Sequence, residues 1–482
     1  MRRELALAVL AAAGACAHAP PNIDGVAGAP ARPNTLWRVP AQVKKAAFHD
    51  TARTIAPRLG DSLSLAQVVD LALQNNPATR LSWAQARAAV DMYGSAQGRW
   101  YPTLTGDVNA TRSRSLAAPG RPAGERTQYG PSLNLSYMVL DFGGRSGTVD
   151  VARQTAIAAD LSHNATVENT VLAVESAAFG FLATRAERDA QRSAVEQAQA
   201  ALDAATERHR VGLATIADVL QARTARSQAQ LTLESLEGNL AIARGALAVA
   251  MGLPANARYD LPDLAETDSV HSVTASVDSL IDLAIQNRPE LAAARAQAAA
   301  ANAQVRVARA AMLPSLGFTA TGANNASTVS TFSGRTYSIG FGLQIPLFSG
   351  FSQSYDLGAA QEQVQAATAR TDIARQQIVQ QVFTAYYGLR TATDRVRTSA
   401  DLLASATESE SVARGRYREG VGSIVDLLIA QSALAAARAQ AVEARWQWHT
   451  ALAQLAHDIG TLGPSGQTSF FSPQAATSAP GR

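Results

Sequence analysis

Apolar and polar residues alternate strictly in two parts of the chain. Near position 340 the apolar set is Ile339, Phe341, Leu343 and Ile345, and the polar set is Ser338, Gly340, Gly342 and Gln344. Earlier in the chain, Leu133, Leu135, Tyr137 and Val139 alternate with Ser132, Asn134 and Ser136. A period of two predicts β-strands with one apolar and one polar face. Because a polar loop lies between consecutive strands, we predict two hairpins with strands of about ten residues, over residues 102–141 and 314–347.

A helical period replaces this alternation after each hairpin. Residues 143–210 and 350–418 contain no proline. In the first stretch apolar residues recur at spacings of four and three, the pattern of a packed helix seam, at Val167, Val171, Val174, Ala178 and Phe181. At 1.5 Å per residue each helix reaches about 100 Å, so it must pack beside other long helices. After Gly212 and Gly420 we predict a shorter return helix.

The sequence contains an internal duplication. "DLALQNNP" at residues 70–77 and "DLAIQNRP" at 282–289 share six of eight positions, and "YPTL" at 101–104 corresponds to "LPSL" at 313–316. "RHRVGLATIADVLQA" corresponds in the same order to "RYREGVGSIVDLLIA". These landmarks indicate a duplicated domain. We therefore predict a first repeat at 61–260, a linker at 261–276, a second repeat at 277–461 and a flexible tail at 462–482.

Composition and motifs exclude several classes of function. The net charge is only +3, and no basic stripe with interleaved aromatic residues is present, so we expect no nucleic-acid partner. The seven histidines are scattered, and no metal-binding, nucleophile or phosphate-binding motif occurs. We therefore expect no catalysis, no cofactor and no metal. A periplasmic enzyme remains only a third candidate.

The amino terminus has the layout of an export signal. Two arginines precede an apolar run, residues 5–15, which is too short to span a bilayer, and the only cysteine, Cys16, follows directly. This stretch resembles a bacterial lipoprotein signal, which implies a signal peptide over residues 1–15 and a lipid on Cys16, followed by a Pro-rich segment over 16–60. The alternative is an ordinary secretory signal cut after Ala19. Both interpretations send the chain out of the cytoplasm.

The length and the two faces of the predicted strands indicate the fold. Their length and two-faced pattern suit tilted membrane strands. Four strands cannot close a barrel, and an open sheet edge is not tolerated in lipid, so other copies must complete it. Three copies supply twelve strands, enough for a water-filled lumen. We predict a mixed α and β membrane protein: a trimeric 12-stranded β-barrel, with four strands per chain, continued below the membrane by the long helices as an α-helical barrel.

The duplicated "DLALQNNP", the Pro-led hairpins, "LDFGGR" with its partner "PLFSG", and the two helix turns together resemble the TolC-like outer-membrane efflux proteins, in their lipoprotein branch. The resemblance covers roughly residues 61–461. It implies the exit duct of a tripartite efflux pump in the outer membrane, fed by a periplasmic adaptor and an inner-membrane transporter. The alternatives are a type I secretion duct and a non-transporting trimeric envelope coiled coil. The transported compounds are not readable from the sequence.

The resemblance also implies functional residues at the two helix turns. The residues that match the family's adaptor-contacting turns are Val211, Gly212, Leu213, Glu419, Gly420 and Val421. Asp218 and Asp426 match positions that line the periplasmic aperture, and the alternative is that each carboxylate simply favours a helix N-terminus.

The aperture departs from the family pattern at three positions. Gly422 stands where some members have an arginine that ties the closed state, and Gln221 and Ile429 stand where some carry a second ring of aspartates. We therefore expect the closed state to be held differently, by Tyr417 donating a hydrogen bond to Asp218. Arg208 and Arg416 are further available partners for the aspartates.

Overall fold

The computed structural model describes residues 22–23, 26–27, 32–36, 63–115, 124–262, 275–328 and 333–463. The predicted signal peptide and Cys16 lie outside the described residues, as do most of the Pro-rich segment, most of the linker and nearly all of the predicted tail.

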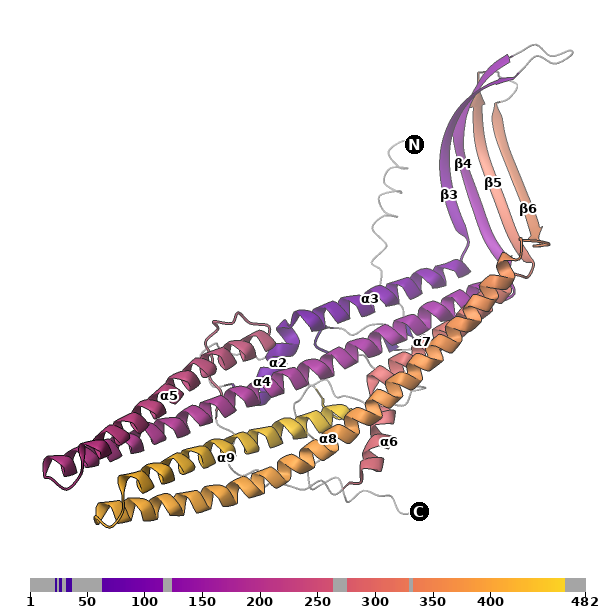
Figure 1. The fold of residues 1–482 in the computed structure, drawn as a ribbon. Coiled ribbons are helices and arrows are strands. Elements are labelled where there is room, and N and C mark those ends of the chain that lie inside the picture. Colours follow the sequence, from indigo (N-terminus) through magenta and orange to yellow (C-terminus); the bar gives the residue numbers. More distant parts are fainter. Residues whose placement is uncertain are drawn as a thin grey trace. The chain divides into compact units, whose positions relative to one another are not determined.

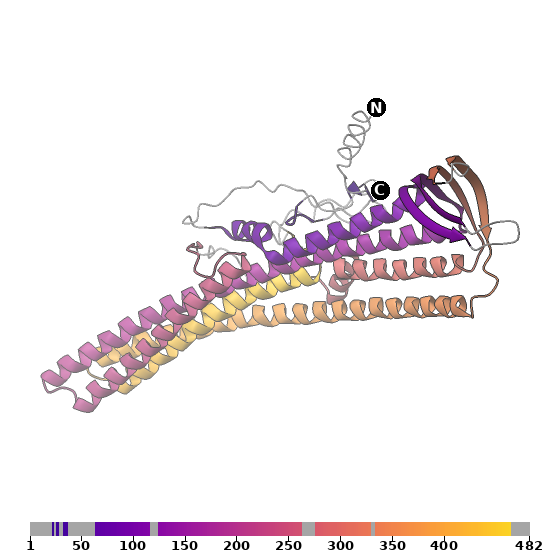
Figure 2. The same ribbon diagram turned by 90° about the horizontal axis from the view of Figure 1, so that it is seen from above.

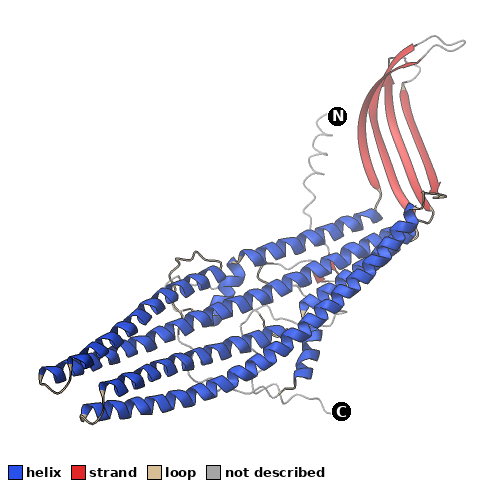
Figure 3. Ribbon diagram, viewed as in Figure 1, coloured by secondary structure: helices blue, strands red, loops and turns tan. Residues whose placement is uncertain are grey.

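The same order of elements occurs twice along the chain (Figures 1 and 3). The first set is α2 (Leu65–Asn75), α3 (Pro77–Gln97), the 3-10 turn η1 (Gly98–Trp100), β3 (Thr103–Ser115), β4 (Gly124–Leu140), α4 (Gly144–Arg210) and α5 (Ile216–Ala250). The second set is α6 (Val277–Asn287), α7 (Pro289–Ala310), β5 (Ser315–Ser327), β6 (Gly334–Gln344), α8 (Ser352–Arg418) and α9 (Ile424–Asp458). A separate pair of short strands is β1 (Asn22–Ile23) and β2 (Val26–Ala27).

The predicted helices and hairpins are confirmed, with two corrections to the strands. The strands β3 to β6 contain 13, 17, 13 and 11 residues, so three of the four are clearly longer than the expected ten. Ile345 lies beyond the end of β6 at Gln344 and does not belong to the strand's alternation. None of the helices in the described part of the chain combines the length and apolarity needed to cross a bilayer.

Contacts divide the chain into two compact units, and each unit takes segments from both repeats. The sheet unit comprises Met1–Ala29, Gln85–Asp160 and Ala292–Asp372. The helical unit comprises Pro30–Ala84, Leu161–Leu291 and Ile373–Arg482. The two repeats are therefore not two separately packed bodies.

The sheet unit contains one antiparallel sheet of order β3-β4-β5-β6, and Figure 2 shows that it is strongly curved. The middle pair, β4 and β5, joins the two hairpins. Its register shifts between Met138 and Leu140, which marks a β-bulge. The alternation predicted for the first hairpin therefore holds for Leu133, Leu135 and Tyr137 but breaks at Val139.

In the helical unit, α5 runs back along α4 and α9 runs back along α8 (Figures 1 and 2). Cross-helix hydrogen bonds link each pair, including Gln191 to the carbonyl of Ala229 and Arg395 to Gln447, both at 2.9 Å. The predicted seam of α4 is confirmed as core, since its five apolar residues are all almost completely buried. A second core, built from α6, α8 and α9, occupies the other repeat.

The duplicated motif that ends in proline makes the joint between α2 and α3, where it reads Asn76-Pro77. Asn76 caps α3, since its Oδ1 accepts from the backbone N–H of Ala78 at 2.8 Å, and proline fits the first helical position. The joint lies against the end of α5, where a Cβ on Gly252 would stand 2.7 Å from the carbonyl group of Asn75. Gly460 meets Asn287 in the same way in the second repeat. The repeated motif thus sets how the return helix docks.

Candidate functional site

Strand pairing gathers side chains of one kind on each face of the sheet. One face carries two cross-strand rows of apolar residues, Leu104–Leu135–Ala320–Ile339 and Tyr137–Phe318–Phe341. The opposite face carries the rows Thr103–Ser136–Thr319–Gly340 and Thr105–Asn134–Thr321–Ser338. The rings of Phe318 and Phe341 lie 5.1 Å apart. One face of the sheet is therefore apolar and suited to lipid, and the opposite face is polar and suited to water.

The polar face is joined by side-chain hydrogen bonds that cross three strands. Asn134 donates from Nδ2 to Asp107 at 2.8 Å, and its Oδ1 accepts from the hydroxyl of Thr321 at 2.8 Å. The hydroxyls of Thr103 and Ser136 lie 2.6 Å apart. These groups satisfy one another while remaining at a solvent-facing surface, so a wet lumen accommodates them and lipid would not.

A clamp built on Arg145 fixes the start of α4 to the bulged end of β4. Asp141 accepts from the Arg145 backbone N–H at 2.6 Å and from its Nε at 3.3 Å, while Nη2 donates to the carbonyl of Val139 at 3.2 Å. The guanidinium lies 4.6 Å from the ring centroid of Trp100 and 5.7 Å from that of Tyr137. Such stacked, paired geometry suits the planar arginine side chain.

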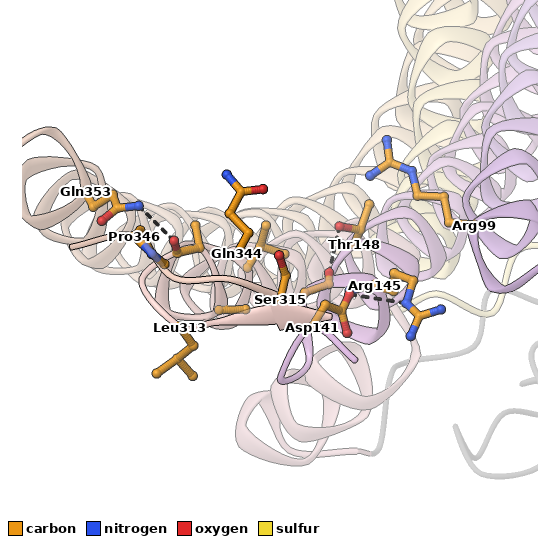
Figure 4. A pocket seen from close by; sticks show the side chains of 13 residues that line it. Arg99, Asp141, Arg145, Thr148, Leu313, Ser315, Gln344, Pro346 and Gln353 are labelled. Carbon is orange, nitrogen blue, oxygen red and sulfur yellow. Dashed lines mark hydrogen bonds and ion pairs between the residues drawn. The ribbon is translucent and has the colours of Figure 1, made fainter. Parts of the chain in front are cut away.

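An open pocket beside this clamp has a volume of about 360 Å³. Figure 4 shows side chains that line it, among them Arg99, Ser315 and Gln344. Its other polar groups are already paired: Thr148 donates to the carbonyl of Gly144 at 2.9 Å, and Gln353 donates to that of Ala311 at 2.8 Å. No nucleophile and base meet there. Over the described ranges, no cluster of His, Cys, Asp and Glu could hold a metal ion.

The two helix turns of the helical unit are built alike. Gly212 and Gly420 both have φ of 78°, in the left-handed region. In the first turn the backbone N–H of Leu213 donates to the carbonyl of Arg208 at 2.8 Å. In the second, the backbone N–H of Val421 donates to the carbonyl of Arg416 at 3.0 Å. These are Schellman turns, which explains the glycine at each. They leave apolar side chains largely exposed, with Leu213 at 71% and Val421 at 69%.

Asp218 and Asp426 occupy equivalent places in the first turns of α5 and α9. Asp218 accepts from the backbone N–H of Thr215 at 2.9 Å, and Asp426 accepts from that of Ser423 at 3.4 Å. Each cap hydroxyl accepts in return, which completes a capping box. The sequence alternative, an aspartate that favours a helix N-terminus, therefore describes a real contact of both residues. It leaves one carboxylate oxygen of each for other partners.

The expected hydrogen bond from Tyr417 to Asp218 is wrong. The Tyr417 hydroxyl is buried and has no hydrogen-bond partner among the described residues. The ring instead packs in a small core with Ala205, Val219 and Ile424. Burial raises the pKa of this hydroxyl above its ordinary value, and the charge of Arg208 opposes the shift while that of Asp218 adds to it.

Arg208 contacts Tyr417 and not the aspartates. Its Nη1 donates to the backbone carbonyl of Tyr417, and its guanidinium carbon lies 4.8 Å from the centre of the ring. Gly422 is also explained, because a Cβ there would stand 3.0 Å from the Cβ of Arg416 and 3.2 Å from the backbone nitrogen of Tyr417. A side chain at this position would require the neighbouring residues to shift.

Two arginine contacts were missed by the sequence interpretation. The Arg145 clamp had a signal, since "LDFGGR" contains both Asp141 and Arg145 at helical spacing. Buried Arg288, which replaces Asn76 of the first repeat, pairs with Asp458 at 3.3 Å and with Glu290 at 2.9 Å. An arginine in place of an asparagine inside an otherwise repeated apolar motif was the available signal for that network.

Comparison with known proteins gives one consistent answer. The chain matches the family described as outer membrane efflux protein over residues 68–253 and 280–461. It is 31% identical to protein CyaE of Bordetella pertussis over 412 residues, covering 84% of this chain and 85% of the relative. It is 25% identical to the probable efflux pump outer membrane protein TtgC of Pseudomonas putida, covering 81% and 79%.

A solved structure has the same fold. The outer membrane protein VceC of Vibrio cholerae superimposes with a TM-score of 0.74 at 20% identity, covering 82% of this chain and 96% of VceC. The sheet continued by long helices is thus a known architecture, and the expected fold class is confirmed. Together, the match over most of the chain and the identity to CyaE mean that this chain belongs to the outer membrane efflux protein family.

Proposed function

We propose that three copies of this chain close their sheets into a twelve-stranded barrel whose polar face lines a water-filled duct. The two-faced sheet supports this proposal, because both polar rows and one apolar row cross all four strands, and the second apolar row crosses three. Within the described chain, β3 and β6 pair on one side only. Unpaired strand edges are not tolerated in lipid, and joining β6 of one copy to β3 of the next removes them.

The duct works as the outer-membrane part of an efflux pump. Family membership makes the chain an outer-membrane exit duct for efflux, and the family consists of passive channels. The channels of this family are trimers that work with adaptor proteins and inner-membrane pumps. The name of the relative TtgC, an efflux pump protein, supports a pump as the source of cargo. A non-transporting coiled coil would leave the sheet without a role.

The two helix turns form the adaptor-contacting end of the duct. Their exposed apolar side chains, Val211, Leu213 and Val421, offer a surface that a partner's apolar residues can cover. The glycines beneath them, Gly212 and Gly420, keep the turns tight. Substitution of Leu213 by Asp weakens capture of the adaptor and leaves trimer assembly intact, which pull-down of the adaptor from the same genomic neighbourhood measures.

Asp218 and Asp426 line the periplasmic aperture as rings of carboxylates, three from each position in the trimer. Rings of acidic side chains favour cations. Because both residues also close capping boxes, substitution by Asn is the informative change: the amide oxygen still accepts from the cap N–H, and only the charge is lost. Asp218→Asn with Asp426→Asn lowers cation selectivity, measured as reversal potential under a salt gradient. An unchanged reversal potential contradicts the assignment.

Cys16 carries the lipid anchor. The order of arginines, apolar run, small residues and cysteine supports this assignment. Cys16→Ser abolishes labelling by a radioactive fatty acid while the barrel still inserts, so efflux persists. Acyl labelling that survives the substitution contradicts the anchor.

The central experiment combines heat-resistant trimer migration with single-channel conductance of the purified protein in a planar bilayer. Only a duct predicts both a trimer that resists denaturing gels and steady conductance. A trimer that never conducts supports the coiled-coil alternative. Loss of export of a dye or antibiotic in a deletion strain, restored by the gene, then connects conductance with efflux.

A further inference from the structure

The pocket beside the Arg145 clamp contains hydrogen-bond donors that the described chain does not use. All the residues that line this pocket of about 360 Å³ belong to the sheet unit. Three of them, Arg99, Ser315 and Gln344, form no side-chain hydrogen bond or ion pair in the described part of the chain. A guanidinium, a hydroxyl and an amide group can all donate. The pocket is therefore equipped to hold an acceptor.

Strand pairing places two of these donors next to each other. Ser315 and Gln344 form the first pair of the ladder between β5 and β6, and Figure 4 shows both side chains on the same side of the sheet. Alternation along β5 assigns Ser315 to the polar face that also carries Thr319 and Thr321. In the proposed barrel, these two donors therefore lie on the face that lines the duct.

The charges around the pocket favour an anion with a single charge. Asp141 is the only acidic residue in the lining, and it already accepts from Arg145 at two nitrogens. The Nη1 of Arg145 is buried and has no hydrogen-bond partner in the described chain. Arg99 and Arg145 against Asp141 leave one positive charge in excess. One excess positive charge beside neutral donors suits a carboxylate better than a doubly charged phosphate.

The rest of the surroundings accommodates an uncharged, apolar group. The apolar side chains in the lining are those of Val307, Ala310, Ala311, Leu313 and Pro346. A second pocket, of about 330 Å³, lies along α7 and α8 and shares Val307, Ala311 and Gln353 with the first. Asp356 lines this second pocket and repels a negative charge there. A bound molecule therefore has its anionic end beside Arg99 and an apolar remainder.

We propose that the pocket beside the Arg145 clamp binds the carboxylate of a small amphiphilic organic acid. Arg99 pairs with the carboxylate, Ser315 and Gln344 donate to its oxygens, and the apolar part lies against Ala311 and Val307. The volume falls within the range of small-molecule sites, which combine apolar walls with a few polar groups. This inference rests on the proposed function as an exit duct, and it names a class of compound that the duct wall binds.

The chain supplies a matched control for the charge. Arg309 lies in the last turn of α7, is exposed, and does not line the pocket. Arg99→Gln and Arg309→Gln therefore remove the same charge from the same unit, and only the first removes a donor from the pocket. Ala311→Phe fills the pocket without changing any charge, and it keeps the backbone carbonyl of Ala311 that accepts from Gln353.

Titration calorimetry of the purified trimer with sodium hexanoate at constant ionic strength tests the site. We expect Arg99→Gln to weaken hexanoate binding about tenfold, as loss of a charge-assisted hydrogen bond implies. Ala311→Phe abolishes binding, and Arg309→Gln binds as the wild type does. Hexanamide, which has the same chain without the charge, binds about tenfold more weakly than hexanoate. Equal hexanoate affinities of Arg99→Gln and Arg309→Gln, or no binding to the wild type, overturn the proposal.

Inorganic phosphate tests whether the apolar part contributes. It carries the oxyanion without the chain, so we expect it to bind more weakly than hexanoate. Phosphate that binds as tightly as hexanoate overturns the assignment to an amphiphilic acid. If Arg99→Gln does not form trimers, Gln344→Leu is compared with the wild type, and equal hexanoate affinity overturns the proposal.

Conductance separates failure of the site from failure of the duct. We expect hexanoate to lower the single-channel conductance of the wild type and of Arg309→Gln, and to leave that of Ala311→Phe unchanged. A wild type that never conducts contradicts the proposed function, while calorimetry still decides whether the pocket binds the acid. Hexanoate that binds the wild type without changing its conductance contradicts the position of the pocket on the duct wall.

Discussion

Replacing Phe341 by arginine tests which face of the sheet meets lipid. Phe341 lies on the apolar face, where its ring contacts Phe318 at 5.1 Å and is 70% exposed in the single chain. Loss of the ring pair costs about 0.5–1.5 kcal/mol. An arginine near the middle of the bilayer costs about 2–4 kcal/mol. The sum, about 3–5 kcal/mol per chain, is enough to reduce assembly more than a hundredfold, since 1.4 kcal/mol corresponds to tenfold.

The neighbouring position is the matched control. Gly342 lies on the opposite face of the same strand, and a Cβ there would meet nothing within 4 Å. Gly342→Arg therefore adds the same charge to the lumen, assembles normally and lowers cation conductance. Phe341→Leu, which keeps an apolar side chain, assembles as well. The assay is the amount of heat-resistant trimer in outer-membrane fractions, followed by conductance of what assembles. Equal loss of trimer in both arginine variants refutes the assignment of the faces.

Three further changes test the helical unit, all through the temperature at which the trimer dissociates on denaturing gels. Gly252→Ala places a Cβ 2.7 Å from Asn75 on a residue with a φ of 74°, and we expect it to cost about 2–4 kcal/mol. Gly212→Ala has the backbone strain but no neighbour within 4 Å, so it costs about 1 kcal/mol. Equal shifts in dissociation temperature would refute the docked joint. Burial raises the pKa of Glu175 to about 7. The buried carboxyl group is tolerated when it is protonated, so the free energy of unfolding falls as pH rises from 4.5 through 7. Glu175→Gln should remove about 3 kcal/mol of that pH dependence, and an unchanged slope would count against it. Arg288→Ala removes the arginine from the buried carboxylate of Asp458 and leaves it only its contacts with Gln454 and His457. We expect a cost of about 3–5 kcal/mol, and a loss below about 1 kcal/mol would show that the pair with Arg288 is dispensable.

The elements could be predicted because each is marked by local chemistry. Proline at Pro77 and Pro289 begins a helix, glycine at Gly212 and Gly420 ends one, and the change of period separates strands from helices. The ends of the strands were not predictable in the same way. β3 and β4 continue into a polar, charged region where Arg112 pairs with Glu125 at 2.5 Å, and there hydrogen bonds extend the strands without an apolar pattern.

The bulge at the base of the sheet also lay beyond local patterns. It arises because Met138 pairs with Gly317 while Leu140 pairs with Leu316, and these partners come from different repeats. A register between segments about 180 residues apart is set by the whole sheet and not by the sequence around either strand. Val139, at this register shift, accepts a hydrogen bond from Arg145 at its carbonyl, which links this end of β4 to the start of α4.

At the end of α8, residue types alone predicted a hydrogen bond that the structure does not contain. Tyr417 lies in the same small core as Val219, the residue that follows Asp218, but it does not donate to Asp218 as expected. The hydrogen bond between them fails for two reasons. The capping box already directs an Asp218 oxygen to the N–H of Thr215, and the tyrosine hydroxyl is buried away from any acceptor of the described chain.

The two repeats differ in the contacts that their equivalent arginines make at the turns. Arg208 and Arg416 are equivalent in the two repeats, and Arg208 donates across to the other repeat, to the carbonyl of Tyr417. The second turn is tightened by Gly422, whose missing side chain lets its N–H reach the carbonyl of Arg416 at 3.0 Å. The first turn thus supplies the donor and the second the acceptor. Tyr417 has His209 as its counterpart in the first repeat, so the buried tyrosine ring that Arg208 covers belongs to the second turn.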